Sequence, residues 1–280
     1  MRNKVKPLFI WAGGKTKVIK YYLDYMPNTV QEYSEPFFGG GAMFLYVKER
    51  YAPQKCYIND IYDGIANIYQ AVKTNVDEFC NIVETYQSKY LPLEKDGRKK
   101  YYYEVRHQHA FEYKNWDKVF EAATLYFLLK TGFNGILQIN KNTNNRYGTP
   151  SGLLNQKDSV YDKDNVYHWN HLLQNVDIFC GDYKNCPPGD FNFLDPPYRD
   201  SFTTYGTAWE DKETEELLSH AMNLPGKVFL CNRDDGTDFF ETRIQDFRMI
   251  KFPITYTAGR RKRTETGFEA KPATEILIFN

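Results

Sequence analysis

The stretch Glu35-Pro36-Phe37-Phe38-Gly39-Gly40-Gly41 joins a short strand, predicted at residues 33–35, to a helix predicted at residues 42–51. Three successive glycines allow the backbone to turn sharply and to come close to a ligand. A second strand is expected at residues 55–59, ending at Asp60, and a further helix follows it. Strands that alternate with helices in this way are typical of an α/β fold with a mostly parallel sheet.

Further elements are predicted on both sides of this region: helices at residues 15–26, 211–223 and 237–246, and strands at residues 191–194, 227–231, 247–253 and 275–279. The fold class is therefore predicted to be α/β, with a Rossmann-like sheet. In such sheets, ligands bind outside the carboxyl ends of the strands.

A chain of 280 residues is long enough for about two domains. Residues 76–130 are predicted to be helical, and residues 132–152 form a loop rich in Asn, Gly and Thr. A loop of that length inside a compact domain more often has a function than serves only as a connection. We predict one domain made of residues 1–75 and 176–280, with residues 76–175 inserted as a second domain.

Composition limits the possible partners and location. The 36 Lys and Arg residues balance the 36 Asp and Glu residues, so bulk charge cannot hold a polyanion, although a local basic surface still can. The run Arg260-Arg261-Lys262-Arg263 is a candidate for such a surface.

Five cysteines without a C-x-x-C pair argue against a disulfide framework or a zinc site, and the five histidines lack the spacing of metal ligands. No segment reads as a signal peptide or a membrane span. We therefore expect a cytoplasmic protein with no metal and no membrane contact.

The segment Asp195-Pro196-Pro197-Tyr198 follows a predicted buried strand and suggests chemistry on an amine. The exocyclic amine of a base is a poor nucleophile because its lone pair is delocalised into the ring. Acceptors aimed at its two N–H bonds correct this, and the Asp195 carboxylate and the Pro196 carbonyl are suited to the task. The prolines fix the backbone, and Tyr198 offers a flat face for stacking on the base.

One other feature suggests a bound nucleoside, and a second motif is rejected as a phosphate-binding loop. Asp60 ends the strand after the glycine turn, which is the place for an acid that takes ribose hydroxyls. Trp11-Ala12-Gly13-Gly14-Lys15-Thr16 resembles a phosphate-binding loop, but Phe9 stands where that motif requires its first glycine, so a P-loop is rejected.

The three motifs, in this order, resemble the Dam-class (D12, α-group) DNA adenine-N6 methyltransferases: W-A-G-G-K, then E-P-F-x-G-x-G, then D-P-P-Y. The resemblance covers nearly the whole chain. It extends to three further stretches: Phe133-Asn134-Gly135, Cys231-Asn232-Arg233-Asp234 and Thr274-Glu275-Ile276-Leu277-Ile278-Phe279.

The resemblance implies an S-adenosylmethionine-dependent methyltransferase that acts on double-stranded DNA as a monomer, in a bacterial cell or a phage-infected host. The product S-adenosylhomocysteine would leave a site formed by Trp11, Lys15, Phe37, Gly39, Gly41, Asp60 and Asp195. The catalytic residues would be Asp195, Pro196, Pro197 and Tyr198, with the target adenine flipped onto Tyr198. A hairpin at residues 133–152 would read the site, and DNA contacts would come from Phe133, Asn134, Gln138, Arg146, Arg260 and Arg261.

One departure concerns the target sequence. Members that read GATC carry an Arg where this chain has Gln138. Arg forms a bidentate contact to guanine, whereas Gln prefers adenine. The end of the hairpin is also altered, to Gly148-Thr149-Pro150-Ser151-Gly152. GATC recognition would then require Arg146 or Lys141 to supply the missing cation, so the target is GATC or a related site.

Three alternatives stay open at this point. Cytosine-N4 methylation uses the same attack geometry, although its enzymes usually carry Ser where this chain has Asp195. Methylation of RNA or of protein amides usually places Asn there. A catalytically silent DNA-binding module is disfavoured because such a protein would not need the whole Asp195–Tyr198 motif.

Overall fold

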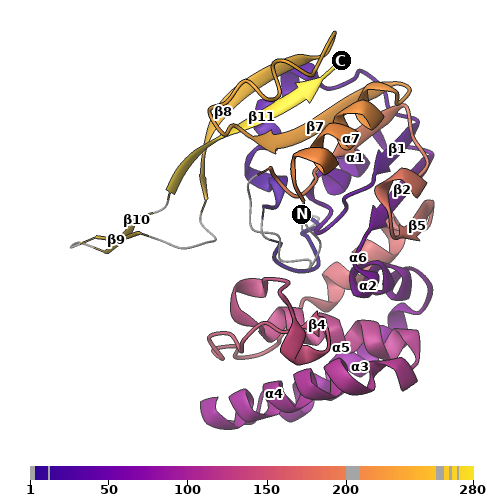
Figure 1. Ribbon diagram of the computed structural model, residues 1–280. Helices are drawn as coiled ribbons and strands as arrows, with labels where there is room; N and C mark the ends of the chain where they lie inside the picture. Colours follow the sequence, from indigo (N-terminus) through magenta and orange to yellow (C-terminus); the bar gives the residue numbers. More distant parts are fainter. Residues whose placement is uncertain (1–3, 12, 200–208, 257–261, 265–266, 270) are drawn as a thin grey trace.

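The computed structural model describes residues 4–11, 13–199, 209–256, 262–264, 267–269 and 271–280. Its centre is a seven-stranded sheet in the order β5-β2-β1-β6-β7-β11-β8 (Figure 1). The strands are β1 (Glu32–Glu35), β2 (Lys55–Asp60), β5 (Val176–Cys180), β6 (Phe191–Leu194), β7 (Lys227–Arg233), β8 (Arg248–Tyr256) and β11 (Lys271–Phe279).

The sheet is parallel from β5 to β7, and β11 is antiparallel to both of its neighbours. Sequential strands run outward from β1 to β2 and β5 on one side, and from β6 to β7 on the other. The strand order therefore reverses between β1 and β6. In open α/β sheets, this reversal opens a crevice at the carboxyl ends of the two strands.

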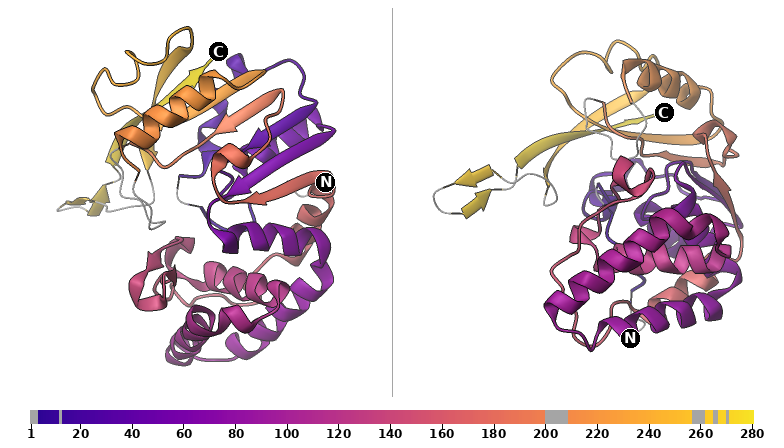
Figure 2. Two further views of the ribbon diagram at one scale, coloured as in Figure 1. Left: turned by 45° about the vertical axis from the view of Figure 1, so that its right-hand side comes forward. Right: turned by 60° about the horizontal axis from the view of Figure 1, so that its bottom comes forward.

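Helices α3 (Val76–Tyr90), α4 (Lys95–Glu112) and α5 (Lys118–Thr131) lie together at one end of the molecule, away from β8 and β11 (Figures 1 and 2). The remaining helices are α1 (Ala42–Tyr51), α2 (Asp63–Thr74), α6 (Lys163–Leu172) and α7 (Asp211–Met222). None of the described helices is long and apolar enough to cross a membrane.

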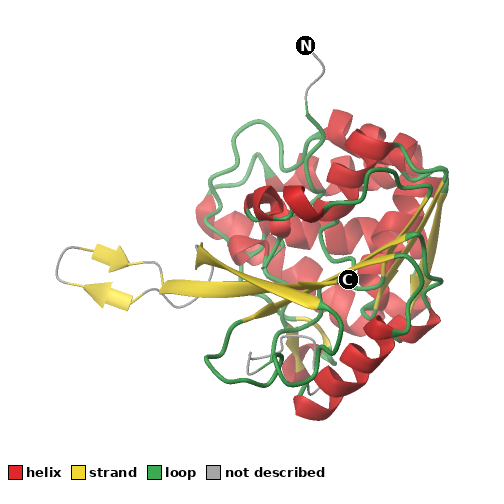
Figure 3. Ribbon diagram, turned by 90° about the horizontal axis from the view of Figure 1, so that it is seen from above, coloured by secondary structure: helices red, strands yellow, loops and turns green. Residues whose placement is uncertain are grey.

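Two short hairpins complete the described structure. Strands β3 (Ile139–Asn140) and β4 (Arg146–Tyr147) pair within the segment where a hairpin was predicted. Strands β9 (Lys262–Thr264) and β10 (Gly267–Glu269) pair with each other and extend away from the rest of the molecule (Figure 3).

Trp169 of α6 joins the helices to the core of the sheet. Its ring is fully buried and stacks on Phe44 of α1, with centroids 5.6 Å apart and planes at 18°. Its indole N–H donates to the Lys6 carbonyl at 2.7 Å. The predicted boundary at residue 175 assigns α6 to the inserted domain, and these contacts link α6 to α1 and to the N-terminal segment.

Several predicted elements are confirmed, including the helix at 42–51 and the strand at 191–194. The helix predicted at 15–26 is wrong. The segment forms three 3₁₀ turns, at Lys15–Lys17, Ile19–Tyr21 and Leu23–Tyr25. Their hydrogen bonds span three residues, as from the Val18 amide to the Lys15 carbonyl, so a similar face is buried by a tighter winding.

The helix predicted at 237–246 is also wrong, because the segment consists of bends and turns. Phe239 and Phe240 are both buried, and their rings meet at 81°. The Asp235 side chain accepts from the Thr237 amide at 2.8 Å and holds the start of the turn. Strand β5 was not predicted at all.

Candidate active site

A cavity of about 1710 Å³ lies at the carboxyl ends of β1, β2, β5 and β6. Segments that follow each of these strands line it, together with Trp11 and residues 13–18 near the start of the chain. The cavity therefore occupies the crevice where the strand order reverses. All predicted catalytic and cofactor-binding residues line it.

Lys15 and Asp195 form an ion pair in this cavity. The Lys15 ammonium lies 2.8 Å from one Asp195 oxygen and also donates to the Gly13 carbonyl at 2.8 Å. The Lys15 side chain is only 4% exposed. A charge removed from water to this extent requires a partner, and Asp195 supplies it.

Burial and pairing act in opposite directions on these two groups. Burial raises the pKa of Asp195, and the Lys15 ammonium offsets that shift only in part. Burial disfavours the charge on Lys15, but the neighbouring Asp195 and Glu275 carboxylates outweigh it and raise the pKa of Lys15. Lys15 is therefore a stable cation beside the acid of the D-P-P-Y motif.

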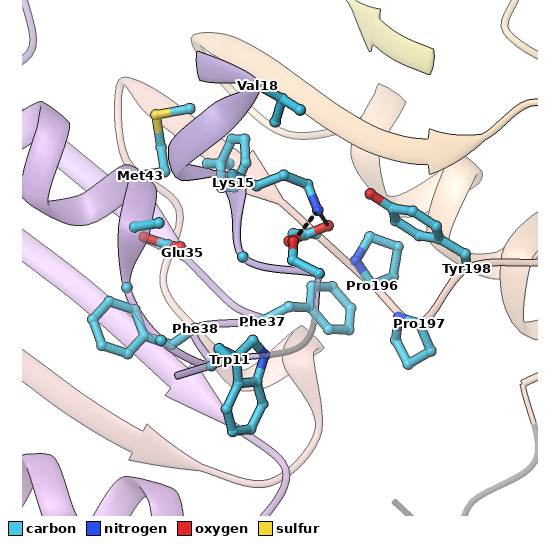
Figure 4. A pocket seen from close by; sticks show the side chains of 18 of the residues that line it. Trp11, Lys15, Val18, Glu35, Phe37, Phe38, Met43, Pro196, Pro197 and Tyr198 are labelled. Carbon is cyan, nitrogen blue, oxygen red and sulfur yellow. Dashed lines mark hydrogen bonds and ion pairs between the residues drawn. The ribbon is translucent and has the colours of Figure 1, made fainter. Parts of the chain in front are cut away.

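Tyr198 presents its ring to the same cation. The Lys15 ammonium lies 5.0 Å from the centre of the Tyr198 ring, and Figure 4 shows the Tyr198 side chain directed toward Lys15. Pro196 is buried, and Pro197 and Tyr198 are half-buried. The motif thus brings a carboxylate and an aromatic face to one wall of the cavity.

The glycine turn lies directly against Trp11. A Cβ atom on Gly39 would come within 2.3 Å of the Trp11 indole nitrogen, and one on Gly40 within 2.9 Å of the Trp11 Cβ. Gly39 and Gly41 also have positive φ angles of 48° and 65°. Glycine is required here both for the close approach and for the backbone conformation.

Asp60 holds the glycine turn through its carboxylate. One oxygen accepts from the Gly39 amide at 3.0 Å and the other from the Tyr62 amide at 2.9 Å. Burial raises the pKa of Asp60 to about 6, although these hydrogen bonds oppose the shift. Each carboxylate oxygen has a second lone pair, so Asp60 can still accept hydroxyl groups from a ligand.

Two residues of the cavity were not found from the sequence. Tyr183 stacks on Phe37, with centroids 5.1 Å apart and planes at 29°, and Asp182 precedes it. Both follow the end of β5, the strand that was not predicted. The alternating segment Val176-Asp177-Ile178-Phe179-Cys180 was the signal that could have located them.

The predicted DNA-binding residues are divided by their exposure. Phe133 is 45% exposed, and Asn134 and Gln138 are also at the surface. Arg146 is 6% exposed, and its guanidinium donates to Asp63 at 2.6 Å and to Glu121 at 2.9 Å. The expectation that Arg146 contacts a base is therefore corrected, because its charge is used inside the protein. Arg260 and Arg261 lie outside the described residues.

No group of His, Cys, Asp and Glu side chains suited to a metal ion occurs among the described residues.

A glycine turn, an acid at the next strand end and a D-P-P-Y segment line one crevice of a mostly parallel sheet. Together they define the class of Rossmann-like methyltransferases.

Comparison with known proteins agrees with this class. Residues 11–256 match the D12 class N6 adenine-specific DNA methyltransferases. The type II methyltransferase M.MjaIII of Methanocaldococcus jannaschii is 29% identical, with 99% of each chain covered. M1.LlaDCHI of Lactococcus lactis subsp. cremoris, also a type II methyltransferase, is 27% identical over 100% of this chain and 97% of its own. A DNA adenine methylase of Haemophilus influenzae is 28% identical over 70% of this chain and 64% of its own.

The chain belongs to the D12 class N6 adenine-specific DNA methyltransferases. Its fold is the Rossmann-like methyltransferase fold, and its activity is adenine-specific methylation of DNA.

Proposed function

We propose that this enzyme transfers the methyl group of S-adenosylmethionine to N6 of an adenine that is flipped out of duplex DNA, and that it acts as a monomer. The observation that best supports the proposal is that Asp195, Tyr198 and the Gly39 turn line the same cavity. A base amine and a methyl donor held there would be neighbours.

The residues present fit S-adenosylmethionine. Its ribose hydroxyls would donate to the buried Asp60 carboxylate, and its adenine ring would lie near the stacked rings of Phe37 and Tyr183. Trp11 packs directly against the glycine turn, and both border the cavity in which the cofactor would lie. When bound, the cofactor supplies an electrophilic methyl group.

The chain's own residues prepare the amine. The Asp195 carboxylate and the Pro196 carbonyl would accept hydrogen bonds from the two N–H groups of the base amine. These hydrogen bonds would direct the lone pair of the nitrogen away from the ring. Lys15 stabilises the ionised form of Asp195, which only then is purely an acceptor. Tyr198 would stack on the flipped base, an interaction worth about 1–3 kcal/mol.

The exposed side chains of the hairpin support a proposal about the target sequence. Arg146 is buried, whereas Gln138 and Lys141 are exposed. Gln138 is therefore the main candidate for reading a base, and Lys141 is the candidate for an exposed cation. Gln forms its bidentate contact with adenine. We propose a short duplex site related to GATC, with an adenine contact where GATC readers contact guanine.

The test is methyl transfer from labelled S-adenosylmethionine to unmethylated genomic DNA, followed by nucleoside analysis and mapping of the modified positions. N6-methyladenine at one recurring short sequence is expected. Asp195→Ala should reduce the rate by at least about 100-fold, the usual effect of removing one such electrostatic group. N4-methylcytosine, or transfer that survives in the variant, would overturn the proposal.

A further inference from the structure

Arg146 lies on the recognition hairpin (residues 133–152), yet it is bonded to a residue beside the cofactor site. Its guanidinium donates to Asp63, the first residue of α2, and to Glu121 of α5. The rings of Tyr113 and Tyr62 lie 4.1 and 4.9 Å from the guanidinium carbon. The arginine is thus fixed on all these sides and joins three elements.

Glu121 makes this arrangement rigid. It is 1% exposed, and besides Arg146 it contacts the His109 ring nitrogen and the Asn67 amide, each at 3.1 Å. Breaking one partner of a buried ion pair leaves an uncompensated charge, which is strongly unfavourable. The hairpin therefore cannot move away from α5 and α2 without breaking this network.

A short path leads from Arg146 to the glycine turn. Tyr62 immediately precedes Asp63, and the Tyr62 amide donates to one Asp60 oxygen at 2.9 Å. The other Asp60 oxygen accepts from the Gly39 amide. A displacement of the hairpin at Arg146 would therefore act on the segment that carries the proposed ribose-binding acid.

A second contact joins the hairpin to the other side of the cofactor site. Gly135 has a φ of 61°, and a Cβ atom on it would come within 2.8 Å of the Ile10 Cβ. Ile10 immediately precedes Trp11, whose ring lies against Gly39. The hairpin thus contacts both segments that border the glycine turn.

We infer that Arg146 is a positioning residue that links the recognition hairpin to the cofactor-binding segment, so that DNA and cofactor strengthen each other's binding. The inference rests on the proposed function, because it assigns DNA to the hairpin and the cofactor to Asp60. Such coupling is reciprocal and typically amounts to about 5–150-fold in affinity.

The experiment measures the dissociation constant of a fluorescent duplex carrying the mapped target site, with and without saturating S-adenosylhomocysteine. In the parent, the cofactor product should tighten DNA binding at least about fivefold. Asp63→Asn removes the charged link at a half-exposed position, and Arg146→Gln removes it at the centre of the network. In both variants, the ratio of the two constants should fall toward one.

Arg106→Gln is the matched control. Arg106 of α4 also supports the hairpin, by donating to the Gly148 and Thr149 carbonyls at 2.9 Å, and these two hydrogen bonds do not pass through Asp63. In Arg106→Gln, the ratio of the DNA dissociation constants without and with S-adenosylhomocysteine should stay at the parent value, even if DNA affinity drops.

A parental ratio kept by Asp63→Asn would overturn the inference, as would a parental ratio of one. A parent that binds neither DNA nor S-adenosylhomocysteine would instead contradict the proposed function.

Discussion

At the scale of single residues, the site depends on charges that the fold holds out of water. Lys15 and Asp195 form an ion pair, and the Asp60 carboxylate accepts hydrogen bonds from two backbone amides. Each of these residues was singled out from the sequence by its motif. Their burial and their partners were not predictable, because the ion pair joins residues that lie far apart in the chain.

Asp60 gives a prediction about pH. Ribose hydroxyls donate hydrogen bonds, so they favour the ionised carboxylate, and burial raises the pKa of Asp60 to about 6. Binding of S-adenosylhomocysteine should therefore be strong above pH 6 and weaken as the pH is lowered through that value. Calorimetric titration from pH 5 to pH 8 measures this. Asp60→Asn should bind weakly throughout, and a variant with the parent's pH profile would rule out Asp60 as the group responsible.

Gln138 gives a prediction about specificity. A guanidinium at this exposed position should form a bidentate contact with guanine, worth about 1–3 kcal/mol of discrimination. Gln138→Arg should therefore shift the mapped methylation sites toward a guanine at one position of the target. Gln138→Ala, which offers neither contact, should lose the preference at that position without gaining guanine. Unchanged sites in both variants would show that Gln138 reads no base.

At the scale of elements, the glycine turn between β1 and α1 forms one wall of the cofactor site. The turn combines a positive φ at Gly39 with contact to the Trp11 ring. Gly236 has a positive φ of 80°, but none of the described residues comes within 4 Å of a Cβ atom added there. The two positions separate the effect of backbone strain from the effect of lost space.

Gly39→Ala should lower the free energy of unfolding by about 1–3 kcal/mol, as expected for a non-glycine residue held at positive φ. It should also weaken S-adenosylhomocysteine binding, because Trp11 must shift to admit the methyl group. Gly236→Ala should cause a smaller loss of stability, from backbone strain alone, with unchanged binding. Chemical denaturation and calorimetric titration measure the two effects, and equal binding by both variants would contradict this view of the turn.

The sequence predicted elements best where periodicity and turn residues agreed. The helix at 42–51 follows three glycines, and the strand at 191–194 ends before two prolines. Errors arose where burial depended on distant partners: in the segment 237–246, Phe239 and Phe240 are buried in a series of turns rather than on a helix. Arg146 of β4 shows the same limit, because its acidic partners Asp63 and Glu121 lie on α2 and α5, far away in the chain.

At the scale of the whole molecule, α6 connects the helical part to the sheet. Trp169 stacks on Phe44 of α1 and also contacts Tyr69 of α2, with centroids 5.3 Å apart. α2 in turn packs on α5, which carries Glu121 of the Arg146 network. The helices that support the recognition hairpin are therefore joined through α2 and α6 to α1, the helix that follows the glycine turn.

This continuity predicts that the two parts unfold together. The parent should show a single calorimetric transition, and Trp169→Ala should shift all of it, because removing a buried Trp costs about 3–5 kcal/mol, on the order of 10 °C for a chain of this size. Trp116→Ala is the control: this Trp is half-buried and packs edge-on against Phe120, so its loss should produce a smaller shift. Two transitions in the parent, with Trp169→Ala displacing only one, would instead show that the recognition helices fold as an independent domain.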